Sequence, residues 1–182
     1  MITRIKKDDA LLVVVDMQGR ILPAMYAKEK VEENTIRLIN GFKAFNAPII
    51  ATEQYPDGLG PTVDSVKEAL GDASVIAKRT FSCCGEPNFI DAVKKAGKKT
   101  IVVCGIESHV CVMQTVFDLK EMGYTVYLAV DAVSSRFETN RDLAFKRMRR
   151  ADIVLDSVEA ILFDMLETST APEFKAISKI VK

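Results

Sequence analysis

The sequence predicts an α/β fold, a three-layer α/β/α arrangement in which a central, mostly parallel six-stranded sheet of Rossmann-like topology lies between helices. Short apolar runs alternate along the chain with longer segments that repeat apolar residues at helical spacing. The runs are continuously apolar, as in strands whose two faces are both covered. With 182 residues, of which 48% are hydrophobic, the chain can bury a sizeable core. We therefore expect a single domain over residues 1–182.

The strand predictions rest on six short runs, most of them rich in β-branched residues. In chain order they are Ala10 to Val15, Pro48 to Thr52, Ser74 to Lys78, Thr100 to Cys104, Thr125 to Val130 and Asp152 to Leu155. The helix predictions rest on the spacing of apolar residues between these runs, and they are Val31 to Phe45, Pro87 to Ala96, Cys111 to Met122 and Thr139 to Arg150. The segment Ala171 to Lys182 predicts a short amphipathic helix that docks on the domain or on a partner subunit.

Composition narrows the range of partners. The chain has 25 Lys+Arg and 25 Asp+Glu residues, and a formal net charge of zero offers no long-range field for nucleic acid or a membrane surface. We expect a small-molecule substrate. The four cysteines, with no leader-like segment and no apolar run long enough to cross a bilayer, fit a reducing cytoplasm. A single histidine and the lack of a CxxC pair argue against a protein-bound transition metal, and no cofactor is expected.

Three chemically active residues follow predicted strands, at the edge of the sheet where open α/β folds bind ligands. Asp16 follows the first strand, Lys78 ends the third, and Cys111 begins the predicted helix after the fourth. A helix N-terminus favours a thiolate. A nearby Lys78 would lower the cost of forming that thiolate and keep Asp16 ionised. The pattern predicts a cysteine nucleophile with Asp16 as its base.

Structural roles are the alternative for these residues. A cysteine is more often a small buried hydrophobe, as we expect for Cys104, and an Asp after a strand often only caps a turn. Cys83 and Cys84 are adjacent, a geometry that seldom forms a disulfide, so we expect free thiols or pocket lining, with their role left open. His109 lies two residues before Cys111, and side chains at that spacing on a helix point in different directions. A Cys-His pair is therefore not expected.

Residues near the predicted strand ends are candidates for contact with substrate, although a packing role is an equal alternative for each. They are Gln18, Tyr55, Phe81, Ile106 and His109. The segment Tyr55 to Pro61 is dense in Gly and Pro, which predicts a shaped loop over the same edge of the sheet.

These residues resemble the isochorismatase-like family of cysteine hydrolases over nearly the whole chain. The three landmarks of that family are an Asp after the first strand, a Lys after the third and a Gly-x-x-x-x-x-Cys at the fourth. Here they read Val15-Asp16-Met17-Gln18, Ala77-Lys78-Arg79-Thr80 and Gly105-Ile106-Glu107-Ser108-His109-Val110-Cys111. The segments Thr52 to Thr62 and Asp131 to Arg136 are most similar to the isochorismatase-domain-containing subgroup.

The resemblance implies a mechanism and an assembly. Asp16 would take the proton of Cys111, Lys78 would stabilise the charges, and the thiolate would form a thioester with the substrate. The backbone N–H groups of Glu107 and Cys111 would hold the oxyanion, beside a cis peptide between Ile106 and Glu107. A homo-oligomer is expected. Nicotinamidases carry metal-binding histidines after the second strand, whereas this chain reads Glu53-Gln54-Tyr55 there.

Three functional hypotheses follow. The leading one is a metal-independent hydrolase of a small amide, carbamoyl or related C–N substrate. The second is a non-enzymatic or redox-sensing interaction module, suggested by Cys83 and Cys84. The third is hydrolysis of a vinyl ether, as in true isochorismatases, which lack the cysteine; it predicts an anion-binding Arg such as Arg79 facing the pocket.

Overall fold

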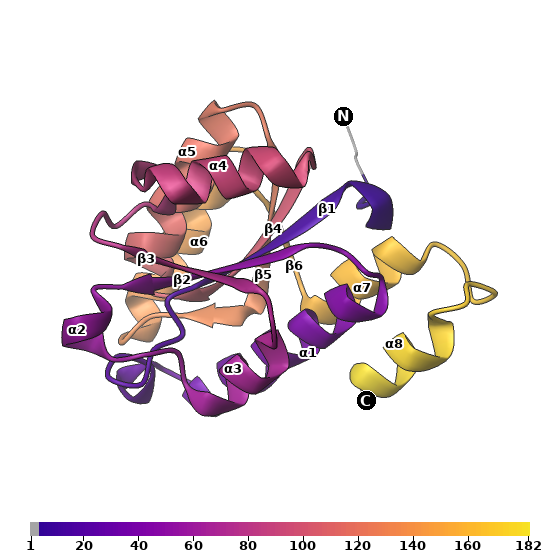
Figure 1. Ribbon diagram of the computed structural model, residues 1–182, viewed down its shortest axis with the longest axis horizontal. Coiled ribbons are helices and arrows are strands. Elements are labelled where there is room, and N and C mark those ends of the chain that lie inside the picture. The colour runs from indigo at the N-terminus through magenta and orange to yellow at the C-terminus, as the bar shows by residue number, and fades with distance from the viewer. Residues whose placement is uncertain (1–3) are drawn as a thin grey trace.

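Six parallel strands form the central sheet of the computed structural model, which describes residues 4–182 (Figure 1). The strand order is β3-β2-β1-β4-β5-β6, so the direction of winding reverses between β1 and β4. The strands are β1 (Ala10–Val15), β2 (Ile49–Gln54), β3 (Ser74–Lys78), β4 (Thr100–Ile106), β5 (Thr125–Ser134) and β6 (Val154–Asp156). The predicted three-layer α/β fold is confirmed, and every strand pair is parallel.

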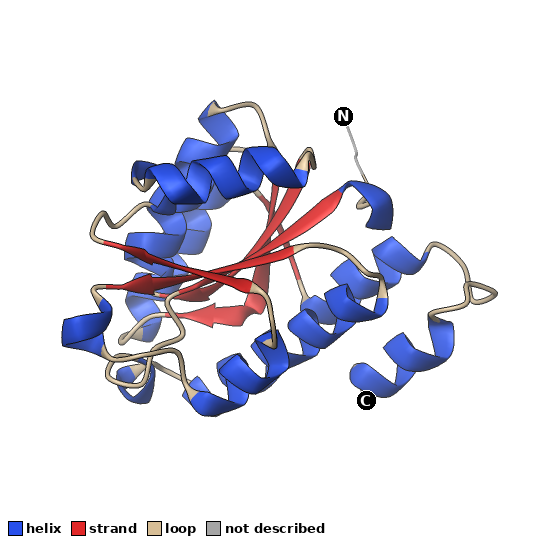
Figure 2. Cartoon of the chain, in the orientation of Figure 1, coloured by secondary structure: helices blue, strands red, loops and turns tan. Residues whose placement is uncertain are grey.

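Helices cover both faces of the sheet (Figure 2). In Figure 1 the helices α4, α5 and α6 lie over one face, and α1, α3, α7 and α8 lie over the other. The α-helices are α1 (Lys28–Ala44), α2 (Pro56–Leu59), α3 (Asp64–Leu70), α4 (Pro87–Ala96), α5 (Met113–Glu121), α6 (Glu138–Arg150), α7 (Val158–Leu166) and α8 (Phe174–Ile180). Shorter turns are the 3₁₀-helices η1 (Lys7–Asp9), η2 (Leu22–Ala24) and η3 (Cys83–Gly85), and the π-helix η4 (Ser108–Val112). Across residues 4–182, no helix is long and apolar enough to cross a membrane.

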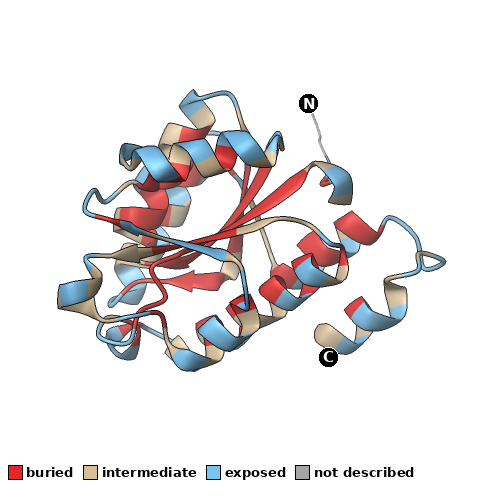
Figure 3. Cartoon of the chain, in the orientation of Figure 1, coloured by how far each residue is buried: buried red, intermediate tan, exposed pale blue. Residues whose placement is uncertain are grey.

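The core is deepest at the two central strands. β1 and β4 are buried at every position, as the red strands of Figure 3 show. β3 differs, because only Lys78 of its five residues is buried and Val75 is exposed. The expectation of strands covered on both faces is therefore correct for the centre and wrong for the two edge strands, β3 and β6, of which β6 has no buried residue. An edge strand has a neighbour on one side only, and the hydrophobic pattern does not reveal which strand takes the edge.

The structure also changes several element boundaries. It adds α3 and α7, and it extends β4 and β5 beyond their predicted ends. β5 is longer because its pairing with β4 contains an irregularity, in which Val103 faces Leu128 but Gly105 faces Val133. The Gly- and Pro-rich segment after β2 contains the short helix α2.

The last helix docks on its own chain. α8 packs against α1 and α7, and Ile177 on its inner side is fully buried. Of the two expectations for the segment Ala171 to Lys182, the structure shows docking within the chain.

β4 approaches β1 so closely at Gly105 that a side chain does not fit there. The φ angle of Gly105 is 111°, and a Cβ atom would lie 2.0 Å from the carbonyl oxygen of Val15. Glycine permits both the φ angle and the close approach. The contact brings together the carboxyl ends of β1 and β4, which carry the segments leading to Asp16 and Cys111.

We expect Gly105→Ala to lower the free energy of unfolding by at least about 3 kcal/mol, because the added methyl group meets backbone on top of an unfavourable φ angle. Urea denaturation measures this change. Gly97→Ala is the matched control: Gly97 also has a positive φ, of 66°, but nothing lies within 4 Å of its added Cβ. That control is expected to cost only about 1 kcal/mol. Equal losses in the two variants would contradict the steric explanation.

Candidate active site

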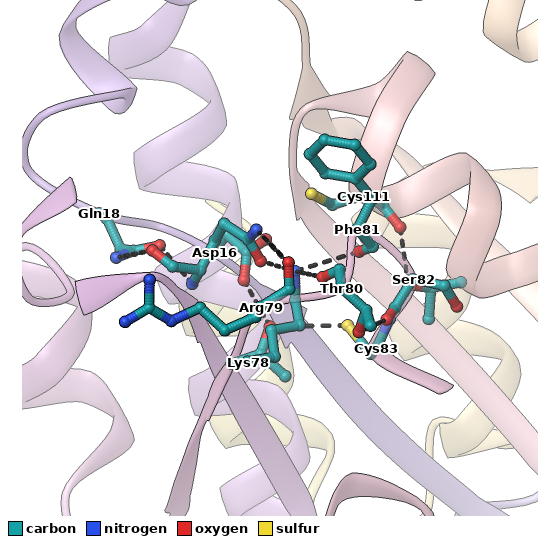
Figure 4. Close-up of polar contacts among 12 residues, drawn as sticks. Asp16, Gln18, Lys78, Arg79, Thr80, Phe81, Ser82, Cys83 and Cys111 are labelled. Atoms are coloured by element: carbon teal, nitrogen blue, oxygen red, sulfur yellow. Dashed lines mark hydrogen bonds and ion pairs between the residues drawn. The ribbon is translucent and has the colours of Figure 1, made fainter. Parts of the chain in front are cut away.

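An ion pair without solvent contact joins the ends of β1 and β3. The Nζ atom of Lys78 lies 2.7 Å from Oδ2 of Asp16, and both side chains are 0% exposed. Figure 4 shows the two side chains pointing toward one another. The usual alternative for a Lys at a strand end, an ammonium group in solvent, does not apply here. A buried pair needs further hydrogen bonds to offset the loss of hydration, and both members have them.

Asp16 is fixed by its backbone as well as by its carboxylate. The residue adopts a left-handed conformation with φ of 51°, and its N–H donates to the carbonyl oxygen of Thr52 at 3.1 Å. Its Oδ1 atom accepts a hydrogen bond of 2.7 Å from Oγ1 of Thr52. The two carboxylate oxygens therefore have different donors, Thr52 and Lys78.

Lys78 also organises the chain that follows it. Its ammonium group donates to Oε1 of Gln54 at 2.9 Å and to the carbonyl oxygens of Thr80 and Phe81 at 3.2 and 3.1 Å. Burial is the largest single effect and lowers the pKa of Lys78, but the charge of Asp16, the neighbouring Cys83 and Cys111 and the hydrogen bond to Asp16 together raise it, and the net change is upward. Lys78 is therefore a cation that holds both the carboxylate and the loop after β3.

Cys111 lies in the π-helix η4, three residues after its start at Ser108. The prediction that the helix begins with the cysteine is therefore wrong. Cys111 is 7% exposed, and its pKa is raised to about 12, first by burial and then by the charge of Asp16, against the opposing effect of Lys78. Burial is the largest of these effects, so the resting group is a thiol.

The turn between β4 and Cys111 is shaped by backbone bonds. The peptide between Ile106 and Glu107 is cis, the geometry that the resemblance implies. The carbonyl oxygen of Glu107 accepts from the N–H groups of Val110 and Val112, at 3.1 and 3.2 Å. Its carboxylate accepts from the N–H of Arg136 at 3.0 Å. Glu107 thus ties the nucleophile turn to the end of β5.

Of the predicted substrate contacts, Gln18 and Ile106 have no exposed side chain. Gln18 is fully buried: its amide donates to the carbonyl oxygens of Gln54 and Gly60 at 3.0 and 2.6 Å, and accepts from the N–H of Gln54 at 2.7 Å. Ile106 is also 0% exposed. Gln18 therefore stabilises the loop after β2 through its hydrogen bonds. Ile106 is a core residue, and its cis peptide bond to Glu107 is part of the turn after β4.

Tyr55, Phe81 and His109 are accessible. The Tyr55 ring lies under the guanidinium of Arg79 at 3.8 Å, and Phe81 is 56% exposed. His109 has its Nδ1 atom 2.9 Å from Oγ of Ser135 and lines a cavity of about 450 Å³ between η4 and α6. These three side chains remain candidates for contact with a ligand.

Thr52, Cys83 and Thr115 join the cluster although the sequence did not single them out for this role. Cys83 is fully buried, and its Sγ lies 3.7 Å from Oγ1 of Thr52. Thr115 accepts from the N–H of Cys83 at 2.9 Å and donates to the carbonyl oxygen of Cys111 at 2.6 Å. A usable signal was the place of Thr52 at the end of a predicted strand, opposite the residue before Asp16. All four cysteines are free thiols.

No group of three or more His, Cys, Asp or Glu side chains with a geometry suited to a metal ion occurs within residues 4–182.

Comparison with known proteins gives a consistent family match. The isochorismatase domain family matches residues 10–159. Isochorismatase domain-containing protein 2 from Danio rerio is 34% identical over 181 residues, which is 99% of this chain and 90% of that protein. The structure of MAR1 ribonuclease from Caenorhabditis elegans is similar with a TM-score of 0.94 and 38% identity, covering 98% of this chain and 92% of that one.

Two structures of YcaC are also similar. YcaC from Pseudomonas aeruginosa, with hexane-2,5-diol and covalent acrylamide, has a TM-score of 0.93 and 27% identity, covering 99% of this chain and 92% of that one. The YcaC gene product from Escherichia coli, an octameric hydrolase of unknown specificity, has a TM-score of 0.93 and 26% identity, covering 99% of this chain and 91% of that one.

We expect Lys78→Met to lower the free energy of unfolding by about 3 to 5 kcal/mol, because it leaves the Asp16 carboxylate buried without its cation. The double variant Asp16→Asn with Lys78→Met removes that isolated charge and is expected to recover part of the loss. Urea denaturation of four proteins, namely wild type, each single variant and the double variant, measures both effects. A double variant less stable than Lys78→Met by the full cost of the Asp16 substitution would show that the two residues are uncoupled.

The ion pair also predicts a specific alkaline loss of stability. The pKa of Lys78 is raised above the ordinary value of 10.5. A raised pKa contributes stability that is fully present below the pKa of the unfolded chain and is lost as pH rises through the higher pKa of the folded protein. The stability difference between wild type and Lys78→Met, measured from about pH 8 to 12, should stay constant and then shrink above about pH 10.5. A difference that already declines near pH 8 would contradict this assignment.

Proposed function

The chain belongs to the isochorismatase family, and we propose that it is a cysteine-dependent hydrolase that cleaves a C–N bond in a small amide, carbamoyl or related substrate. The observation that carries the proposal is the position of Cys111 beside the buried Asp16 and Lys78 pair, where both charges act on its thiol (Figure 4). A thiol with a raised pKa needs a base at the moment of attack, and Asp16 is the carboxylate in this cluster.

In the first half-reaction, Asp16 takes the proton from Sγ of Cys111, and the sulfur attacks the substrate carbonyl carbon. Lys78 stabilises the thiolate as it forms, since its charge lowers the pKa of Cys111. The backbone N–H groups of Glu107 and Cys111 hold the oxyanion of the tetrahedral intermediate. Asp16 then gives its proton to the leaving nitrogen, so that ammonia or an amine departs and a thioester remains on Cys111.

In the second half-reaction, a water molecule replaces the leaving group. Asp16, again a carboxylate, takes a proton from that water, which attacks the thioester carbonyl. The acid product leaves when the C–S bond breaks, and the proton returns from Asp16 to Cys111. The same base therefore serves both steps.

Small substrates are favoured by the burial of the cluster. Cys111 is 7% exposed and Asp16 is not exposed at all, so the reacting carbonyl must enter a narrow space. The covalent acrylamide in P. aeruginosa YcaC supports a nucleophilic side chain in that relative that a small molecule can reach, since acrylamide is attacked at its C=C bond. The activity in the name of the C. elegans ribonuclease is not extended to this chain, because its zero net charge offers no general attraction for RNA.

The two other hypotheses receive less support. The vinyl ether hypothesis requires an Arg that faces the pocket. Arg79 is instead a surface residue: its guanidinium stacks on the Tyr55 ring, and its Nη2 atom lies 3.6 Å from Oδ2 of Asp57. The redox-sensing hypothesis requires accessible thiols, but Cys83 is fully buried and only Cys84 is partly exposed.

The assembly and location are part of the proposal. We propose one domain over residues 1–182, supported by a hydrophobic core that runs from Ile5 to Ile177. A homo-oligomer is supported by the octamer of E. coli YcaC. A reducing compartment such as the cytoplasm is supported by four free thiols.

The test is ammonia release from a panel of amides, ureas and carbamoyl acids, run beside Cys111→Ala. We expect the variant to lose at least about a thousandfold in turnover on any substrate that the wild type hydrolyses. Intact mass of acid-quenched wild type should show an acyl adduct on Cys111. Cys84→Ala, which alters a half-buried thiol outside the cluster, is the matched control and should keep wild-type turnover. Undiminished turnover by Cys111→Ala would reject the cysteine mechanism.

A further inference from the structure

Asp16 is held by a second buried side chain besides Lys78, and that side chain has a buried partner of its own. Oγ1 of Thr52 donates to Oδ1 of Asp16 at 2.7 Å and lies 3.7 Å from Sγ of Cys83. Resting on the proposed function, we propose that Cys83 and Thr52 form a hydrogen-bond relay that positions the Asp16 carboxylate for proton transfer with Cys111. Both are positioning residues, because neither is placed to touch the substrate.

The direction of the relay follows from counting hydrogens. An ionised carboxylate can only accept, so the single hydroxyl hydrogen of Thr52 is committed to Asp16. The remaining contact of Oγ1 must then be an acceptor contact, and the hydrogen comes from the Cys83 thiol. Burial raises the pKa of Cys83 to about 11, so the thiol keeps this hydrogen at neutral pH. The order is Cys83 to Thr52 to Asp16.

Two donors on different strands fix the carboxylate more firmly than one. Lys78 on β3 holds Oδ2, and Thr52 on β2 holds Oδ1. The terminal torsion of an Asp side chain is soft, so a carboxylate held at one oxygen can rotate about it. With both oxygens held, the plane of the carboxylate is set, and with it the direction in which Asp16 meets the proton of Cys111.

Cys83, the first residue of the relay, is also connected to Cys111 through Thr115. The N–H of Cys83 donates to Oγ1 of Thr115, and Thr115 donates to the carbonyl oxygen of Cys111. Thr115 thereby sets the distance between the loop that carries Cys83 and the turn that carries Cys111. Cys83 thus contributes to positioning both Asp16, through Thr52, and Cys111, through Thr115.

Cys84 shows that adjacency in sequence does not suffice for this role. Its Sγ lies 4.0 Å from the carbonyl oxygen of Thr115, and its N–H donates to Oγ of Ser82 at 3.2 Å. It is only half-buried, whereas Cys83 is fully buried. Cys84 therefore supplies a matched control for substitutions of Cys83.

A substrate-free experiment tests the relay through the reactivity of Cys111. The rate of alkylation by iodoacetamide is followed at the Cys111 peptide by mass spectrometry, as a function of pH. Thr52→Val should slow this rate about tenfold, the effect of losing one hydrogen bond to a charged group. The acid limb of its pH profile should move to higher pH, because the lost donor favoured the ionised carboxylate. Thr52→Ser should restore most of both.

Cys83→Ala should slow the reaction by about threefold, since the relay loses its first donor but Thr52 remains. Cys83→Ser, which keeps a donor, should recover the rate, and Cys84→Ala should match wild type. Asp16→Asn separates the two proposals. If it reacts as fast as wild type or faster, as expected when the charge of Asp16 only raises the pKa of Cys111, Asp16 is not the base and the proposed function fails.

If Asp16→Asn slows alkylation while folded Thr52→Val and Cys83→Ala keep the wild-type rate and pH profile, the relay is overturned and the proposed function stands. Thermal melting establishes that each variant is folded. If Thr52→Val does not fold, the comparison of Cys83→Ala with Cys83→Ser decides, and equal rates for that pair overturn the relay.

Discussion

The structure of the site depends on one buried ion pair, between Lys78 and Asp16. Removing two charges from water is costly, and hydrogen bonds from Thr52 to Asp16 and from Lys78 to Gln54, Thr80 and Phe81 help to offset this cost. Lys78 reaches the loop after β3 through two carbonyl oxygens, and Asp16 reaches β2 through Thr52. The pair therefore joins the ends of β1, β2 and β3 at the same edge of the sheet to which β4 brings Cys111.

The sequence permits a good prediction of the fold and of the three central residues. Parallel strands must end at a common edge, so Asp16, Lys78 and Cys111 could be brought together from strand order in the chain alone. Which strand lies at the edge of the sheet was harder to predict. A continuous apolar run does not show whether a strand is central, and β3 is an edge strand. The irregularity in β5 has no periodic signal either, since it depends on how β4 and β5 meet.

The protonation state of Cys111 and the contact between Thr52 and Cys83 could not be predicted from sequence patterns, for a different reason. The thiol state of Cys111 results chiefly from desolvation, which is a property of the packed environment. Thr52 and Cys83 come from segments 31 residues apart, and their contact exists only after β2 and β3 have paired. Such supporting residues carry no motif of their own. They are found by following the hydrogen bonds outward from the charged pair.

The charge balance of the cluster has a consequence for the ligand. The resting site holds one cation, one anion and the neutral thiols of Cys83 and Cys111, and moving the proton from Cys111 to Asp16 leaves the total at zero. The proposed proton transfer would therefore move charge over a short distance within the site. The net charge of this buried region would not change. A neutral molecule can enter such a site without an additional Born penalty, whereas an ionised one must bring its own charge into low dielectric. The burial of the pair thus acts as a filter for electroneutral ligands, or for ligands whose ionised groups stay outside.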